Sequence, residues 1–222
     1  MSAQAVLDEL QGLGSAQTLA TYRRHGVLGD AYGVSYAALG KLKKRIRTDH
    51  ALALALWDSG NHDARILAMM VADPAKVSEA ELGAWAAGVL GHVQAQAVAN
   101  FAGRTAHAQR CVDAWKDSPE ESTSATGWTT LAVLANEDAT LPDAFFIPRL
   151  EQIEREIHGS ANRVRQAMNN ALMAIGIRGA GLAEQAIAAA RRIGKVHVDH
   201  GDTACKTPDA EPYILKARAR KA

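Results

Sequence analysis

The chain has 222 residues, of which 48% are hydrophobic and only 5% aromatic, and its formal net charge is +1. This length and hydrophobic content allow one substantial core, and no linker rich in Pro, Gly or Ser interrupts the chain, so we expect a single domain over residues 1–222. A net charge near zero gives no attraction of the whole molecule to nucleic acid, so any such binding must depend on local basic patches.

Apolar residues recur with a helical period along most of the chain. In chain order, the expected helices are Ala3–Leu10, Ser15–Arg24, Tyr36–Ile46, His50–Trp57, Asp63–Val71, Ser78–Val89, Val93–Phe101, Ala106–Trp115, Ala125–Ala135, Asp143–Ile157, Ala161–Ile175 and Leu182–Ile193. Short connections pair them into about six antiparallel hairpins. Because such hairpins cannot each bury an apolar face alone, we expect an all-α, HEAT/ARM-like α-solenoid of stacked hairpins. A globular helical bundle is the alternative, since no strict sequence repeat is present.

Several residue types support these helix limits. Ser78 and Glu81 form a capping box, in which each side chain bonds to the backbone of the other residue. Gly60, Gly176 and Gly194 are expected at helix ends, where a residue without a Cβ adopts a left-handed conformation at least cost.

One segment has an ambiguous pattern, because Leu52, Leu54 and Leu56 alternate with alanines as they would in a strand. Alanine is a poor strand former, and the segment lies between helical neighbours. We therefore expect a helix that is buried on two sides.

The sequence carries no sign of a membrane segment or a secretory leader. No apolar run approaches the roughly 18 residues that a membrane span needs, so a cytoplasmic protein is expected. Cys111 and Cys205 lie far apart and form no disulfide framework, so free thiols are expected. No cofactor is predicted.

Three stretches of the chain resemble the DNA alkylation repair family, the AlkD-type HEAT-like proteins. The longest is the run Leu56 to Ala68 (LWDSGNHDARILA), which is followed by Asp73-Pro74. The other two are Tyr32-Gly33-Val34 with Leu39 and the basic run Lys41 to Arg47, and Asn169-Asn170-Ala171-Leu172 through Gly176 with the tail Val198 to Ala210. Together they span nearly the whole chain.

This resemblance implies stacked helix pairs whose basic concave face cradles duplex DNA. For active members it also implies DNA glycosylase activity, which is hydrolysis of the glycosidic bond of alkylated, cationic purines such as 3-methyladenine and 7-methylguanine. A carboxylate suits that reaction because it stabilises the positive charge that develops on the sugar. Aromatic walls can add cation–π stabilisation.

The chain departs from the family pattern at the catalytic acid. Matching the family's helix places Gln96 at that position, or Ala95 with a slip of one residue, and no Asp or Glu occurs from Leu82 through Val112. The family's two tryptophans match His92 and Asn170. A glutamine can orient water but cannot offset positive charge.

Efficient base excision would therefore need an acid from another helix. Glu137 and Asp138 are the candidates. His92 and Gln96 lie four residues apart and share a helix face, as a catalytic pair would, but a packed histidine beside a structural glutamine explains the same spacing.

Basic residues form local runs that could contact phosphates. The candidates for DNA binding are Lys41, Lys43, Lys44, Arg45, Arg47, Arg163, Arg165 and Arg178, with Arg191, Arg192 and Lys195 as a further run. On one concave surface they would neutralise backbone phosphates and release counterions. On opposite faces they would only be solvated.

Two other segments attract attention. The turn Trp57 to Gly60, with His62, Asp63 and Arg65 beside it, is interpreted as structural, with Asp63 in the first turn of the next helix. The tail holds the metal-ligand types His197, Asp199, His200, Asp202 and Cys205, but their spacing matches no familiar zinc motif. We expect no metal there and interpret residues 196–222 as a capping segment, held by Asp and Thr bonds to its own backbone, with Lys216 to Lys221 as a frayed helix end.

The sequence thus predicts a DNA-binding protein of this family with weak or no N-glycosylase activity, which binds duplex or distorted DNA. The first alternative is an active glycosylase that takes its carboxylate from another helix. The second is a helical-repeat scaffold that binds a protein partner and not DNA.

Overall fold

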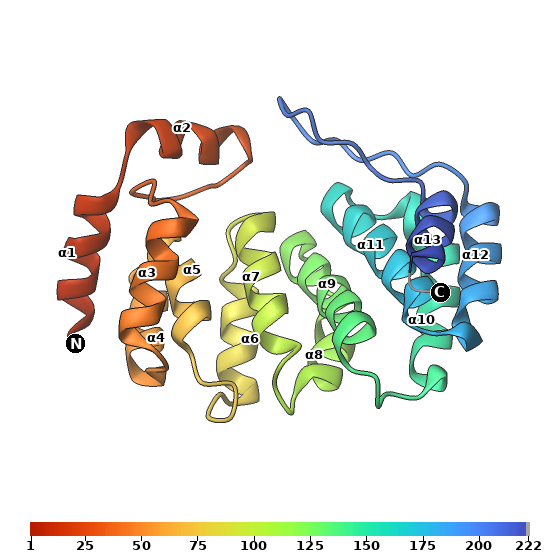
Figure 1. Cartoon of the computed structure of the whole chain (residues 1–222), viewed down its shortest axis with the longest axis horizontal. Helices are drawn as coiled ribbons and strands as arrows, with labels where there is room; N and C mark the ends of the chain where they lie inside the picture. Colours follow the sequence, from red (N-terminus) through yellow and green to blue (C-terminus); the bar gives the residue numbers. More distant parts are fainter. Residues whose placement is uncertain (221–222) are drawn as a thin grey trace. The chain divides into compact units, whose positions relative to one another are not determined.

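The computed structural model describes residues 1–220, and the regular secondary structure of this part of the chain is all helical, without strands. The α-helices are α1 (Ala3–Leu13), α2 (Ala16–Arg24), α3 (Tyr36–Ile46), α4 (His50–Asp58), α5 (His62–Val71), α6 (Glu79–Ala87), α7 (His92–Ala102), α8 (Ala108–Trp115), α9 (Glu121–Glu137), α10 (Asp143–Glu156), α11 (Asn162–Arg178), α12 (Ala180–Ile193) and α13 (Ala210–Ala219). A short 3-10 helix, Ile157–Gly159, follows α10. The predicted all-α class is confirmed (Figure 1).

The helices group into two compact units. Unit 1 contains residues 1–107 together with 201–203, and unit 2 contains residues 108–200 and the described residues from 204 onward. The expectation of a single domain over residues 1–222 stays a prediction.

Unit 1 owes its helix limits to side chains that cap free backbone N–H groups. Asp49 accepts a hydrogen bond from Leu52 N (3.0 Å) at the start of α4, and Asn61 Oδ1 accepts from Asp63 N (3.0 Å) and Ala64 N (3.2 Å) at the start of α5. The alternating leucines lie in α4, as expected, and Leu56 is fully buried there.

Of the residues predicted to mark helix ends, all but Gly176 do so. The capping box of Ser78 and Glu81 is present, and Gly60 and Gly194 adopt φ values of +75° and +67° beside the ends of α4 and α12. The prediction for Gly176 was wrong, because this residue lies inside α11. A methyl group there would lie 2.6 Å from Ile214 Cδ1, so the glycine allows α13 to pack closely on α11.

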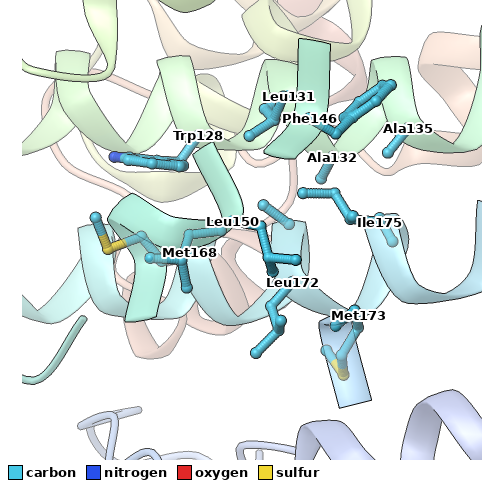
Figure 2. Packing of buried hydrophobic residues seen from close by; sticks show 14 of the residues in the cluster. Trp128, Leu131, Ala132, Ala135, Phe146, Leu150, Met168, Leu172, Met173 and Ile175 are labelled. Atoms are coloured by element: carbon cyan, nitrogen blue, oxygen red, sulfur yellow. The ribbon is translucent and has the colours of Figure 1, made fainter. Parts of the chain in front are cut away.

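The core of unit 2 lies between α9 and α11, which run past each other over most of their length. Figure 2 shows Trp128 and Leu131 of α9 facing Met168 and Leu172 of α11, with Phe146 of α10 beside them. All five side chains are buried. This burial is the main source of stability for the unit, because apolar area removed from water contributes roughly 25 cal/mol per Å².

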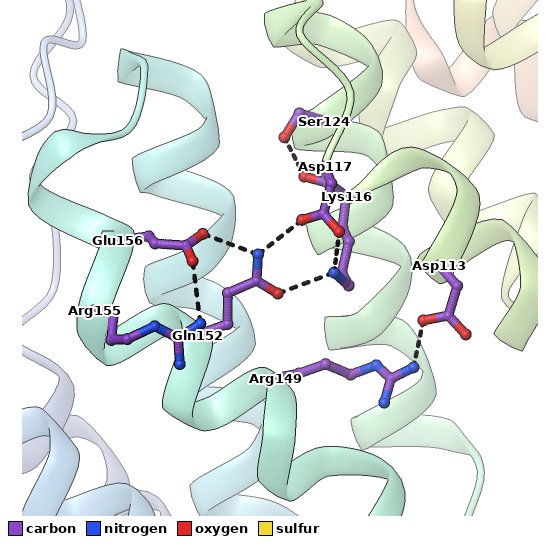
Figure 3. A network of polar contacts seen from close by, with 8 residues as sticks. All are labelled: Asp113, Lys116, Asp117, Ser124, Arg149, Gln152, Arg155 and Glu156. Atoms are coloured by element: carbon purple, nitrogen blue, oxygen red, sulfur yellow. Dashed lines mark hydrogen bonds and ion pairs between the residues drawn. The ribbon is translucent and has the colours of Figure 1, made fainter.

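A polar network joins the end of α8 to α10 on the surface of unit 2 (Figure 3). Lys116 Nζ donates to Gln152 Oε1 (2.9 Å), and Gln152 Nε2 donates to Asp117 Oδ1 (2.7 Å) and Glu156 Oε2 (2.9 Å). Ser124 Oγ donates to the Lys116 carbonyl (2.6 Å), which fixes the start of α9 against the same turn. These bonds hold the turn after α8 against α9 and α10.

The C-terminal helix packs against unit 2. Residues 195–209 leave α12 and return to α13 without regular secondary structure (Figure 1). Ile214 is fully buried, and Arg218 Nη1 donates to the carbonyls of Gly176 (3.3 Å) and Gly179 (3.0 Å). The prediction of a frayed, solvated helix end was therefore wrong for Arg218, whereas Lys216 and Arg220 are exposed as predicted, and Lys221 lies outside the described residues. No helix within residues 1–220 is both long and apolar enough to cross a membrane.

Candidate nucleic-acid interface

The basic run of unit 1 lies on the exposed side of α3. Leu39 and Leu42 bury the opposite side of the helix. Lys41, Lys43 and Lys44 are exposed, and their ammonium groups make no hydrogen bond or ion pair with any described residue. They are available to an external anion, because an uncompensated surface cation attracts phosphate most strongly.

The two arginines of this run behave differently from the lysines. Arg45 pairs with Glu9 of α1, and that carboxylate raises the pKa of the guanidinium. Arg47 caps α3 with φ of +64° and ψ of −132°, a backbone conformation that residues with a Cβ rarely adopt. A strained arginine at a position that would suit glycine motivates the hypothesis that its side chain has a function.

The arginines predicted from unit 2 bind mainly within the protein. Arg178 donates to the carbonyls of Asp138 and Leu141 and lies 4.6 Å from the Phe146 ring centre. Arg165 Nη1 donates to the His197 carbonyl (2.8 Å), and its Nη2 donates to the Ser160 carbonyl (2.9 Å). The guanidinium groups of both arginines already donate hydrogen bonds to backbone carbonyls of loops. A contact of either arginine with DNA stays a prediction.

The remaining arginines near the C-terminal half of unit 2 are also engaged. Arg163 Nη1 donates to Gln166 Oε1 (2.9 Å), within the first turns of α11. Arg191 pairs with Glu211 (2.7 Å), and Arg192 makes two hydrogen bonds to Glu154. The cations of the predicted set whose side chains make no hydrogen bond or ion pair with a described residue are thus the three lysines of the α3 run, Arg47 and Lys195.

The position predicted to match the family's acid lies on the exposed side of α7. Gln96 is exposed, and its Nε2 donates to Asn100 Oδ1 (2.9 Å), one helical turn away. His92 is half-buried at the start of the same helix, and a methyl group at Gly26 would lie 3.8 Å from its Cε1. Asn170 is exposed on α11 of unit 2. None of these side chains can supply a negative charge.

The two acids proposed as substitutes lie at the end of α9. Glu137 is the exposed last residue of that helix. Asp138 Oδ1 accepts from Thr140 Oγ1 (2.6 Å) and Thr140 N (2.9 Å), and these bonds lower the pKa of the carboxyl. Asp138 is therefore ionised at neutral pH, but its oxygens already organise the turn into α10.

The turn before α5 has a structural role, as the sequence indicated, but the hydrogen bonds that Asp63 makes were not predicted. Asp63 is fully buried, and its carboxylate accepts from the backbone N–H groups of Tyr32 (2.7 Å), Gly33 (3.1 Å) and Val34 (2.9 Å). It thereby fixes the loop that leads into the basic helix α3. Three charge-assisted bonds make Asp63 the strongest single anchor of that loop.

A buried amide network beside this anchor was missed from the sequence. Gln94, which is fully buried, accepts from Leu90 N (2.9 Å), and its Nε2 lies 3.3 Å from His62 Nδ1. Arg65 donates to the Gly88 carbonyl (2.8 Å) and stacks 4.7 Å from the Trp57 ring centre. The helical spacing of Gln94 among alanines and valines was the only available signal.

Burial has an electrostatic consequence at His62. Loss of solvation is the largest cause that lowers the pKa of its imidazole below the usual 6.5, while the Asp63 carboxylate opposes this change. The ring is therefore neutral at pH 7 and serves as a hydrogen-bonding core residue, because a charged ring would be poorly solvated there.

The tail is held in part by asparagines of α11. Asn162 Oδ1 accepts from Asp199 N, and its Nδ2 donates to the Asp199 carbonyl, each at 2.8 Å. Asn169 Nδ2 donates to the Pro208 carbonyl (3.0 Å). The interpretation that Asp and Thr of the tail hold its own backbone was incomplete for this reason. Among residues 1–220, no group of three or more His, Cys, Asp or Glu is arranged to hold a metal ion.

Comparison with known proteins places this helical architecture in a class. Residues 6–213 match the family model described as DNA alkylation repair enzyme. The chain belongs to that family, as the resemblance of its motifs implied.

A solved structure shares the fold along the whole chain. Its TM-score is 0.90 with 28% sequence identity, and the match covers 100% of this chain and 95% of the other. That structure is described as a new family of proteins related to the HEAT-like repeat DNA glycosylases with affinity for branched DNA structures. The predicted HEAT-like class is thus confirmed.

Two bacterial relatives are similar at the level of sequence. An uncharacterized protein of Listeria innocua is 32% identical over 219 residues, and an uncharacterized protein of Listeria monocytogenes is 31% identical over 219 residues. Each match covers 96% of this chain and 95% of the relative.

Proposed function

We propose that this protein binds DNA, with branched DNA as the preferred form, and that it releases alkylated bases weakly or not at all. Membership of the DNA alkylation repair family supports DNA as the partner. The affinity for branched DNA that is stated for the structural relative supports the preferred form.

The proposal of weak or absent base release rests on one observation, which is that α7 offers no acidic side chain. Gln96 stands where the family's acid is expected and is bonded to Asn100, and residues 82–112 contain neither Asp nor Glu. Glycosidic cleavage of a cationic purine leaves a sugar that carries developing positive charge. A neutral amide cannot stabilise that charge as a carboxylate does.

The binding half rests on α3. This helix carries three exposed lysines whose ammonium groups have no partner among the described residues, Lys41, Lys43 and Lys44. Asp63 anchors the loop that precedes the helix. Backbone phosphates are the ligand that such a row fits, since each neutralised phosphate releases condensed counterions. Net charge near zero explains why binding would be confined to this local surface.

The test is a titration of a duplex and a four-way junction at several salt concentrations. We expect tighter binding of the junction, and a loss of affinity with salt whose logarithmic slope is roughly −0.9 for each phosphate contacted. A protein scaffold would bind neither DNA, and weak binding without salt dependence would also contradict the proposal.

A further inference from the structure

A second feature of unit 1 lies away from the basic helix, where the segment after α2 contacts the turn between α6 and α7. A methyl group at Gly29 would lie 3.0 Å from Leu90 Cδ1, and one at Gly91 would lie 3.0 Å from the Gly26 carbonyl oxygen. Gly26, Gly29 and Gly91 have φ values of +72°, +70° and +86°, which favour glycine. The two segments therefore meet backbone to backbone.

Arg23 holds the first segment in this conformation. Its Nη1 donates to the Val27 carbonyl (2.8 Å) and its Nη2 donates to the Gly29 carbonyl (2.7 Å). Val27 N donates to the Tyr22 carbonyl (3.0 Å), and the Val27 side chain is buried. The residue between these two anchored carbonyls is Leu28.

This arrangement presents apolar side chains to solvent. Leu28 is 59% exposed and Leu90 is 40% exposed, although the backbone on either side of Leu28 is fixed by hydrogen bonds. Single exposed leucines are common on protein surfaces. Leu28 and Leu90 differ from scattered leucines because the segments that carry them contact each other, so the two side chains can form one small apolar surface.

The charges of the two segments identify the kind of partner. Residues 15–29 and 82–112 contain no Asp or Glu, and the first segment contains the exposed Arg23 and Arg24. Asp30 is the nearest acid in sequence, and its backbone carbonyl accepts from His62 N (2.7 Å). An apolar pair bordered by these two arginines suits a ligand that combines an apolar face with anionic groups, as nucleic acid does.

We propose that Leu28 and Leu90 form an apolar wedge that stacks on the base pair exposed where a DNA duplex ends at a branch point. The interior of a continuous duplex offers no such face, because each base pair there is covered by its neighbours. Leucine is among the side chains that proteins insert between base steps. This inference rests on the proposed binding of branched DNA and assigns residues to the preference for the branch.

The test compares variants on a four-way junction and on a duplex of the same base composition, both with hairpin-closed ends so that no terminal base pair is exposed, at one salt concentration. Leu28→Gln with Leu90→Gln should weaken binding of the junction about tenfold and leave duplex affinity unchanged, because only the stacking contact is lost. Leu13→Gln with Leu215→Gln is the matched control, since these leucines are 43% and 48% exposed elsewhere, and it should change neither affinity.

A second variant tests the wedge by enlarging the side chain that would stack on the base pair. Leu28→Trp should tighten junction binding, since an indole ring stacks on a base better than a leucine does. A 2-aminopurine placed next to the branch should change its fluorescence on binding the wild type, and less on binding the double glutamine variant.

The outcomes separate the two proposals. If the wild type prefers the junction and the double glutamine variant keeps that preference, the wedge is wrong and the proposed function stands. The same holds if duplex and junction affinities fall equally. If the wild type binds neither DNA, the proposed function fails and the wedge fails with it.

Discussion

Gln96 donates a hydrogen bond from Nε2 to Asn100 Oδ1 across 2.9 Å on the exposed side of α7. This pair occupies the helix from which active members of the family are expected to present their acid. Two neutral amides that satisfy each other leave no negative charge for a developing sugar cation.

Restoring only the acid should therefore not restore the enzyme. In Gln96→Asp, we expect release of 7-methylguanine from methylated duplex to stay at the spontaneous rate, because the positions predicted to match the family's tryptophans still hold His92 and Asn170. Release would be followed by chromatography of free bases, with Gln96→Asn as the neutral control. A clear rise for the Asp variant alone would show that the missing carboxylate was the only defect.

Charge reversal on α3 should weaken DNA binding of every form. For Lys43→Glu with Lys44→Glu, we expect affinity to fall at least tenfold at low salt and the logarithmic salt slope to shrink by about two, one for each lost phosphate contact. Lys76→Glu with Arg155→Glu changes the net charge equally at exposed positions elsewhere and should have little effect. Equal behaviour of the two double variants would remove α3 from the interface.

Replacing Arg47 by glycine should stabilise the fold and weaken DNA binding. Its φ of +64° suits glycine, so Arg47→Gly is expected to raise the free energy of unfolding by about 1 kcal/mol through relief of backbone strain. The same change removes a cation from the α3 run and should weaken DNA binding severalfold. Urea unfolding and DNA titration of one preparation measure both, and Arg47→Lys, which keeps charge and strain, should change neither much.

Asp63 should be the residue of the turn before α5 that is most sensitive to substitution. Asp63→Asn keeps the shape of the side chain but replaces an acceptor of buried N–H bonds by an amide donor, at a cost of about 3 kcal/mol. The free energy of unfolding in urea gives the result. Asp58→Asn, a change at the end of the preceding helix, is the control, and an equally small effect of both substitutions would mean that Asp63 does not anchor the 32–34 loop.

The helices could be predicted well because the apolar period and the caps are local properties of the sequence. Tyr36–Ile46 was predicted with the limits that the structure has, and α4 was recognised despite its alternating leucines. Gly176 could not be assigned correctly, because a glycine inside a helix looks like a helix end until the approach of Ile214 is known.

The side chains of the candidate site were harder to predict, because their roles depend on partners distant in sequence. Arg165 and Arg178 were selected as surface cations, and most of the carbonyls that they bind lie far away along the chain, at separations of 32, 37 and 40 residues. Gln94 was overlooked two residues from Gln96, although the first is fully buried and the second exposed. Sequence spacing indicates a helix face but not which polar groups remain unpaired beside it.

The most direct test of the central claim measures base release and binding in the same samples. Purified protein is mixed with methylated duplex and with a methylated four-way junction at low salt. We predict binding of both, tighter for the junction, with 3-methyladenine and 7-methylguanine released only at the spontaneous rate. Enzymatic release above that rate would contradict the account, and Glu137 and Asp138 would then be the first residues to replace.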